Sequence, residues 1–226
     1  SSNTNGAYKT NDNITVTASF SENVIVDNSS GNPSILLETG TIDRFANYVS
    51  GNSSILSFLY TVQSGDTASD LDYKAINSFS DNGSNIRDNA SNDANLTLAS
   101  PGGSNSLASN KSIIIDGIKP TFSSSSPSDN ATGIAKNTSI AITLSEPINT
   151  SSVSVNTGSD NCDSFSLQVS GDDFENCVKM ASNPSISNSD ATFSITPSDN
   201  LSPAVNYKFK LNDNITDVAG NTINTY

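Results

Sequence analysis

The stretch Lys111-Ser-Ile-Ile-Ile-Asp-Gly-Ile-Lys-Pro-Thr-Phe122 decides how the chain divides. Three consecutive isoleucines end at Asp116-Gly117, and Pro120 follows. A short apolar run bounded by Gly and Pro predicts a buried strand that stops abruptly. Proline biases the preceding Lys119 toward an extended backbone, so the chain should leave the strand without folding back. We therefore expect a seam here between two β domains, residues 1–117 and 118–226.

Composition favours an all-β fold. Hydrophobic residues make up 34% and charged residues 15% of the 226-residue chain, whose net charge is −13. Low hydrophobicity with a high net charge is typical of disorder, but here the apolar residues are grouped in short runs. Such runs, separated by turns rich in Ser, Thr and Asn, predict β-sandwiches.

Period-two alternation marks most of the expected strands, because alternate side chains of a strand point to the same face of a sheet. The expected strands cover residues 14–20, 35–38, 44–49, 55–62, 71–76, 113–115, 140–144, 165–169, 191–195 and 207–211. No clear strand precedes them. Both halves should be antiparallel sandwiches, with a core that includes Val16, Phe20, Phe58 or Tyr60, Ile142, Leu144, Phe193, Ile195 and Tyr207 or Phe209.

Two short motifs occur once in each half and in the same order. Ser21-Glu22-Asn23 follows the first alternating strand, and Ser145-Glu146-Pro147 follows the strand at 140–144. Later, Ile86-Arg-Asp-Asn-Ala-Ser-Asn92 matches Ile215-Thr-Asp-Val-Ala-Gly-Asn221. Two matched signals in the same order indicate an internal duplication.

Charge and composition argue against several functions. With ten Lys and Arg against 23 Asp and Glu, the chain lacks the clustered cations that nucleic acids require. No apolar segment is long enough to insert into a membrane. The absence of histidine excludes Ser–His and Cys–His catalysis and a Cys/His zinc site. A glycosidase needs only two carboxylates, but no Trp is present to stack a sugar, so we do not expect an enzyme.

The order of these motifs resembles bacterial immunoglobulin-like domains of surface proteins. The second half carries the closer match, in Pro127-Ser-Asp-Asn-Ala-Thr-Gly133, Ser145-Glu-Pro147, Thr196-Pro197, Tyr207 and Asp217-Val-Ala-Gly-Asn221. The first half resembles a related subtype through Tyr8-Lys9, Leu37-Glu-Thr-Gly40, Tyr60-Thr-Val62 and Gly65-Asp66. Ser91, where the family usually has Gly, and a cysteine-bearing insertion depart from the pattern.

The resemblance implies two tandem immunoglobulin-like sandwiches from an exported protein of the bacterial cell surface. Such a module acts as a stalk or spacer among neighbouring repeats, or contributes to adhesion. Two alternatives stay open: a module that binds a carbohydrate or a host protein, and an accessory domain of a secreted hydrolase. In an exported protein Cys162 and Cys177 should form a disulfide, whereas in a cytosolic one they would be two thiols. We expect the bridge to pin an insertion rather than the core.

Carboxylates in turns are candidates for calcium, which binds six to eight oxygens from flexible loops. The first candidates, in the turn that follows the strand at 55–62, are Asp66, Asp70 and Asp72. Asp116 lies at the seam, and Glu146 and Asp217 lie in turns of the second domain. By analogy with cadherins, calcium at the junction would stiffen it. The alternative is that these residues are ordinary turn formers that bond their own backbone.

Overall fold

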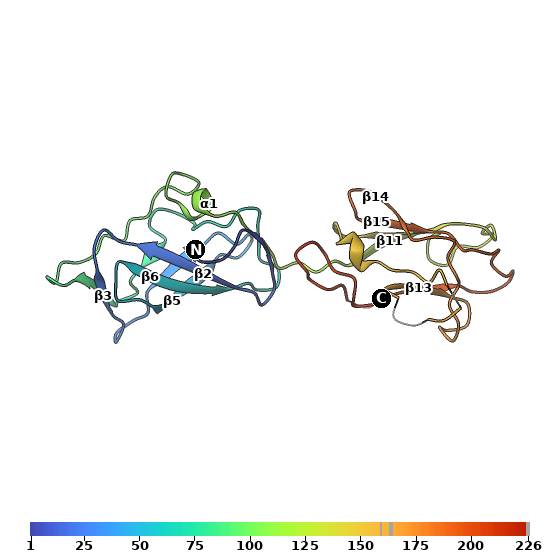
Figure 1. Cartoon of the computed structure of the whole chain (residues 1–226), viewed down its shortest axis with the longest axis horizontal. Coiled ribbons are helices and arrows are strands. Elements are labelled where there is room, and N and C mark those ends of the chain that lie inside the picture. The colour runs from blue at the N-terminus through green and yellow to red at the C-terminus, as the bar shows by residue number, and fades with distance from the viewer. Residues whose placement is uncertain (159, 163–164, 225–226) are drawn as a thin grey trace. The chain divides into compact units, whose positions relative to one another are not determined.

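The computed structural model describes residues 1–158, 160–162 and 165–224, which fold into two compact units (Figure 1). The first unit is Ser1–Ile118 and the second is Lys119–Tyr226. The sequence placed this boundary after Gly117. Each unit has its own hydrophobic core.

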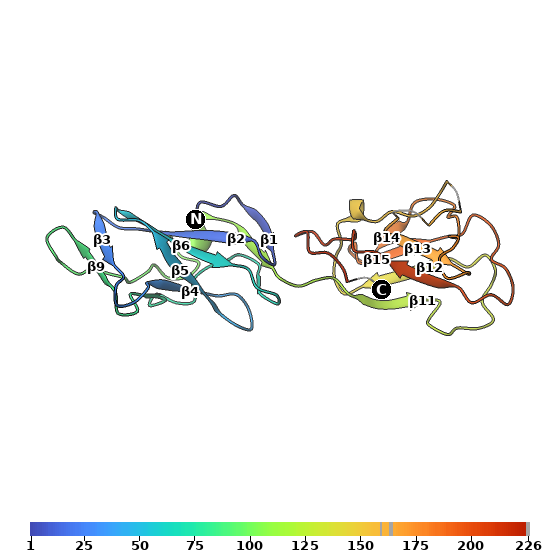
Figure 2. The same cartoon turned by 90° about the horizontal axis from the view of Figure 1, so that it is seen from below.

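The first unit is built on a five-stranded sheet. Its strands, in spatial order, are β2 (Asn13–Ser19), β6 (Ile55–Thr61), β5 (Arg44–Ser50), β4 (Ser34–Leu37) and β8 (Phe79–Ser80). A second pair consists of β3 (Val24–Asp27) and β9 (Asn85–Asp88), which lie side by side (Figure 2). A third sheet contains β1 (Gly6–Lys9), β10 (Ile113–Asp116) and β7 (Thr67–Ala68), and a single-turn helix, α1 (Leu107–Asn110), precedes β10.

Alternation correctly predicted the core of this unit. Phe58 and Tyr60 are both buried, at 0% and 2% exposure, because they lie two residues apart on β6. Val16 lies opposite Phe58 on β2. Phe20 is partly buried and packs edge-on against Phe79. The period of two thus selects the inward face of β2 and β6.

Three expectations for the first unit are wrong. Residues 71–76 form no strand and pair only at Tyr73, through a bridge to Leu37. A first strand does exist, since β1 pairs with β10, and this ladder is parallel rather than antiparallel. The isoleucine run is not wholly buried, because Ile113 and Ile115 face the core while Ile114 is 41% exposed.

The second unit contains two antiparallel sheets. One has the order β11 (Phe122–Ser126), β12 (Ile140–Leu144), β15 (Thr192–Ile195) and β14 (Ser185–Ser187). The other pairs β13 (Leu167–Ser170) with β16 (Lys208–Leu211), and a short 3-10 helix, η1, covers Thr150–Ser152. The expected core residues of β12 and β15 are buried, and Tyr207 and Phe209 pack partly buried against them.

Cys162 and Cys177 form a disulfide, as predicted. The expectation that it pins only an insertion is wrong. The loop it closes contains β13, whose Leu167 and Val169 are 2% and 1% exposed members of the core. Val178, the residue after Cys177, also donates its N–H to the Val169 carbonyl at 2.7 Å. The bridge therefore ties a core strand to the segment that follows it.

The two units repeat one hydrogen-bond pattern. Phe20 N donates to the Ser54 carbonyl at 2.8 Å, and Leu144 N donates to the Ala191 carbonyl at 2.9 Å. The strands behind these bonds keep the same register: Ala18 pairs with Leu56, and Ile142 pairs with Phe193. The first duplicated motif therefore ends equivalent strands in the two units.

The second duplicated motif also folds the same way twice. Val24 pairs with Asp88 in the first unit, and Ile148 pairs with Asp217 in the second. Asp88 N donates to the Asn92 carbonyl at 3.0 Å, and Asp217 N donates to the Asn221 carbonyl at 3.1 Å. The duplication seen in the sequence is therefore a duplication of backbone structure.

Candidate functional site

Asp66 is the most enclosed of the candidate carboxylates. It is 1% exposed and lies in the turn that follows β6. One carboxylate oxygen accepts from Tyr60 Oη at 2.7 Å and from Gln63 N at 2.9 Å, and the other accepts from Arg44 Nε at 2.9 Å. Both oxygens are thus held by donors of the protein itself, which gives Asp66 a structural role.

The environment of Asp66 also fixes the protonation state of Tyr60. Burial raises the pKa of Tyr60 well above its usual value, and the hydrogen bond to Asp66 raises that pKa further. The phenol therefore stays protonated and donates to the carboxylate. The charged residue Arg44 at the start of a strand is the sequence signal for this network, but the sequence alone does not show that Asp66 is its partner.

The Asp66 turn holds the end of the first unit. Gly117 N donates to the Asp66 carbonyl at 2.7 Å, and Gly65 N donates to the Gly117 carbonyl at 2.8 Å. A Cβ on Gly117 would lie 2.3 Å from the Gln63 carbonyl oxygen, so only glycine fits against this backbone. The glycine after Asp116 is therefore required by close packing at the point where the chain leaves the unit.

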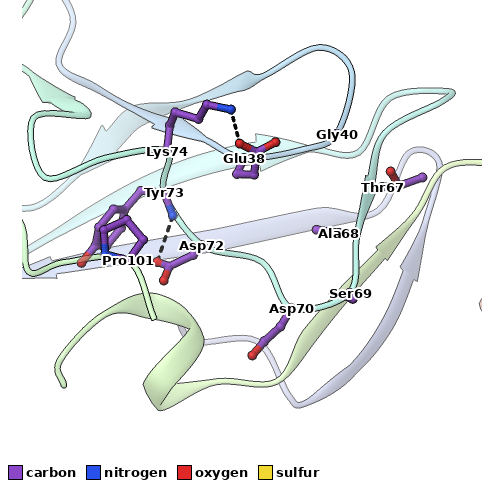
Figure 3. A pocket seen from close by; sticks show the side chains of 10 residues that line it. All are labelled: Glu38, Gly40, Thr67, Ala68, Ser69, Asp70, Asp72, Tyr73, Lys74 and Pro101. Atoms are coloured by element: carbon purple, nitrogen blue, oxygen red, sulfur yellow. Dashed lines mark hydrogen bonds and ion pairs between the residues drawn. The ribbon is translucent and has the colours of Figure 1, made fainter. Parts of the chain in front are cut away.

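Asp70 and Asp72 line one pocket, of about 370 Å³, together with Glu38 and Lys74 (Figure 3). Asp72 accepts hydrogen bonds from the backbone N–H groups of Tyr73 at 2.9 Å, Gly102 at 2.8 Å and Leu107 at 3.2 Å. Glu38 forms an ion pair with Lys74.

The carboxylates of this pocket do not converge. In Figure 3 those of Glu38, Asp70 and Asp72 lie apart and point to different places. Asp66, the third candidate of the same turn, is not among the residues that line the pocket. The pocket therefore does not gather its acids around one cation, and calcium binding by this turn stays a prediction that the geometry does not favour.

Glu146 and Asp217 come from adjacent segments of the second unit, because Ile148 and Asp217 form a β-bridge. Glu146 follows Ser145, whose N–H donates to the Thr121 carbonyl at 2.9 Å and whose Oγ accepts from Thr121 N at 2.9 Å. Both acids therefore lie where the chain enters the second unit. Asp116 ends β10 in the first unit and accepts from Ile118 N at 3.2 Å.

The Asp-x-Ala-(Ser/Gly)-Asn turns are built around their first residue. Asp217 accepts from the N–H groups of Gly220 at 2.6 Å and Asn221 at 2.8 Å, and from Asn221 Nδ2 at 2.7 Å. Asp88 accepts from Ala90 N, Asn92 N and Asn92 Nδ2, each at 2.8 Å. The Asn92 amide lowers the pKa of Asp88. These bonds account for Asp and Asn at the two ends of the motif.

A smaller polar cavity of about 220 Å³ escaped the sequence reading. Asp81, Ser84 and Asn85 line it beside the ion pair of Arg87 and Asp93.

Asp172 is another acid that closes its own turn, since it accepts from Ser170 Oγ and from both Asn176 nitrogens. Asp and Asn occur so often in this chain that composition could not single these positions out.

No helix within the described part of the chain is both long and apolar enough to span a bilayer.

The family model of the bacterial Ig-like domain matches residues 116–226. This half of the chain is a bacterial Ig-like domain. The family model does not cover the first unit, but that unit repeats the hydrogen bonds and register described above, and both units are nearly all β, as in tandem Ig-like sandwiches.

Other comparisons add little detail. No curated protein matches the chain. Among solved structures, the N-terminal part of the bacterial S-layer protein SbsC is similar, at 20% sequence identity and a TM-score of 0.33. The similarity covers 47% of this chain and 22% of the S-layer chain. The chain therefore spans well under half of the solved structure that it resembles.

Proposed function

We propose that the chain is a non-catalytic spacer module of an exported bacterial cell-surface protein. The observation that carries the proposal is the repetition of one Ig-like hydrogen-bond pattern in two units of a single chain. A repeated sandwich adds length to a protein, and neighbouring Ig-like repeats are its natural partners. The disulfide supports an oxidising location outside the cytosol.

The short connection between the units supports a spacer. Hydrogen bonds of the first unit hold the chain as far as Ile118 N, and those of the second unit hold it from Thr121 N onward. Between these positions lie Lys119 and Pro120. Two residues span only about 7 Å when extended, and proline fixes its own φ and restricts the residue before it. Little free chain therefore separates the units.

Spin labels test the spacer directly. Cysteines at the exposed positions Ser104 and Thr132 place one label in each unit. We expect a narrow distribution of label distances in the parent and a broad one when Lys119-Pro120 is replaced by a several-fold longer Gly/Ser linker. Equally broad distributions in both proteins would contradict the spacer function.

Calcium binding is the second part of the proposal, and its candidate ligands are Glu146 and Asp217 of the second unit. These two acids come from adjacent segments of that unit, and oxygen-only ligands favour calcium. Asp66 and Asp72 already accept hydrogen bonds from the protein itself, so we do not include them in this proposal.

Calorimetric titration of the chelated protein with calcium tests this assignment. Glu146→Gln should lose calcium uptake, whereas Glu22→Gln, the same change at the duplicated position of the first unit, should keep it. Uptake that is absent from the parent, or equal in the two variants, would remove calcium from the proposal and leave the spacer standing.

One observation favours ligand binding as a second candidate function. Phe45 and Val49 on β5 and Ile55 on β6 are 54%, 52% and 49% exposed on the sheet of the first unit. An exposed apolar face marks an interaction surface where its side chains form a contiguous patch. Screening the parent and Phe45→Ser against immobilised glycans and surface proteins would show whether this face binds either class.

A further inference from the structure

We propose that two copies of the chain dock face to face through the five-stranded sheet of the first unit. The proposal deepens the second candidate function, on which it rests, by naming the partner of the exposed face that contains Phe45. It does not depend on the spacer function. The docking surface is the outer face of the sheet, which consists of the odd-numbered residues of β2, β5 and β6 and the even-numbered residues of β4.

Apolar side chains run along this outer face. Leu36 lies directly opposite Phe45. Leu59 lies opposite the residue two positions after Phe45, so Phe45 and Leu59 are diagonal neighbours. Diagonal neighbours are about 7–8 Å apart, within reach of aromatic and long side chains. Val49 and Ile55 flank the turn between β5 and β6 and extend the apolar surface to that end of the sheet.

The outer face carries no charged side chain. Among the described residues of β2, β4, β5 and β6, its positions hold only Ser, Thr, Asn, Leu, Phe, Val and Ile. Charges begin at its edge, where Glu38 follows β4 and Asp43 precedes β5, and both pair with Lys74. Depletion of charge at the centre with a polar rim is the composition of a protein–protein interface.

The fold itself does not require apolar residues on this face. The second unit repeats the pairing of β2 and β6 with β12 and β15, in the matched register described above. In that register Thr192 takes the position of Ile55, and Thr196 takes the position of Leu59. The outward positions of β12 and β15 hold only Ala, Ser and Thr. A sheet with the same pairing thus folds with small and hydroxyl side chains outside, so the apolar outer face belongs to the surface of the first unit rather than to its fold.

The charge of the first unit selects a second copy as the partner. This unit contains twelve Asp and Glu against five Lys and Arg, so two copies that meet through their charged surfaces bring like charges together, which is unfavourable. Two outer faces can meet without burying a charge, and they avoid its desolvation cost. A cationic partner would be attracted to the acidic surfaces elsewhere on the unit and not to this one.

The same face on both molecules also suits a two-fold axis, which places one patch against an identical patch. Two sheets that pack face to face keep their strand directions within about 30° of each other and interdigitate their side chains. The apolar side chains around Phe45 in one copy would then contact those of the other copy. We therefore expect a symmetric pair rather than an open chain of molecules.

The outer face is small, so the dimer should be weak. Strands β2, β5 and β6 have seven residues each. At about 3.4 Å per residue and about 4.8 Å between strands, they give a flat footprint of about 340 Å². A stable interface buries about 800 Å² on each partner. We therefore expect reversible pairing at high protein concentration rather than a permanent dimer.

Sedimentation velocity of the full chain between about 10 μM and 1 mM tests the pairing. The parent should sediment faster as its concentration rises. The double variant Ile55→Thr, Leu59→Thr, which carries the residues of the second unit, should dimerise at least several-fold more weakly. Ile114→Thr is the matched control, because Ile114 is 41% exposed on β10, in a different sheet, and this variant should match the parent.

Salt distinguishes this pairing from one driven by opposite charges. Added salt screens the repulsion between two acidic copies, so the dimer of the parent should become stronger. A parent that stays monomeric at all concentrations, a dimer weakened by salt, or an equal loss in the double variant and in Ile114→Thr would each overturn the proposal.

Crosslinking provides a second measurement that does not depend on the double variant being folded. Asn47→Cys places a thiol on the outer face beside Phe45, and Ser104→Cys places one at an exposed position outside this sheet. Under a mild oxidant only Asn47→Cys should give a disulfide-linked dimer, and equal crosslinking of the two variants would contradict docking through the outer face. A monomeric parent that binds a glycan or a surface protein in the Phe45 screen would overturn the second copy as partner and leave the second candidate function standing.

Discussion

Replacing Asp66 by alanine should destabilise the first unit by removing one acceptor from three donors. Tyr60 Oη, Gln63 N and Arg44 Nε all donate to this carboxylate, which is 1% exposed. Among the described residues, Asp66 is the acceptor for all three donors. The change therefore leaves donors without partners rather than simply deleting a contact.

The magnitude follows from how well water can replace the acceptor. Tyr60 is 2% exposed, and an unsatisfied buried donor costs about 1–3 kcal/mol. The Arg44 side chain is 30% exposed and Gln63 is exposed, so water can reach both, and their losses are smaller. Breaking a buried ion pair by removing one partner costs about 3–5 kcal/mol. Partial exposure of Arg44 places our expectation at the lower end, about 3 kcal/mol.

Urea unfolding of the full chain measures this loss. Four of the six tyrosines, at positions 8, 48, 60 and 73, lie in the first unit, so near-ultraviolet circular dichroism reports mainly on that unit. Asp70→Ala is the matched control, because Asp70 is an exposed acid of the same turn region. A loss for Asp66→Ala within about 0.5 kcal/mol of the control, the usual range of surface substitutions, would refute the reasoning.

Three further changes follow from the same contacts. Gly117→Ala should lower the free energy of unfolding, measured in urea, by about 1–3 kcal/mol, the usual range for overpacking. Gly158→Ala should leave it unchanged, because a Cβ there meets nothing within 4 Å. Equal effects of the two substitutions would contradict the steric argument. Replacing Cys162 and Cys177 by serine should lower the unfolding free energy of the second unit by about 3 kcal/mol, since the bridge closes a loop with a sequence separation of 15. An unchanged urea midpoint for this unit would contradict a stabilising role of the disulfide. Because the pKa of Tyr60 is raised in the folded state, its stabilisation is complete below about pH 10 and is lost as the pH rises further. The parent should therefore lose stability above that pH more steeply than Tyr60→Phe, and parallel pH profiles would contradict this.

The strands that the sequence predicted best are those whose side chains alternate between core and solvent. On β2, β6, β12 and β15 the buried positions are apolar at every second residue, so the pattern alone selects one face. The prediction of a strand at residues 71–76 is wrong. Leu71, Asp72 and Tyr73 are all buried, whereas every second residue of a half-exposed strand faces solvent. The backbone there is shaped by the bonds that Asp72 accepts.

Strand β1 could not be predicted from its own residues. Gly6-Ala-Tyr-Lys9 has neither alternation nor a high β propensity at its start, and it becomes a strand only because β10 lies beside it. The partner follows more than a hundred residues later in the chain. The network around Asp66 is only partly local in the sequence: Tyr60 lies 6 residues from Asp66, but Arg44 lies 22 residues away, and Gly117 comes from the end of the unit.

The duplication limits what the acidic motifs can mean. Asp88 and Asp217 each accept from the backbone N–H and the side-chain amide of the Asn four residues later, so the turn alone explains why both positions carry Asp. Glu22 and Glu146 likewise follow equivalent strands, and an acid that served only the fold would serve it equally in both units. A role in calcium binding would need a difference between the two copies of the motif. Different calcium uptake by Glu22→Gln and Glu146→Gln would therefore separate a ligand from a residue inherited through duplication.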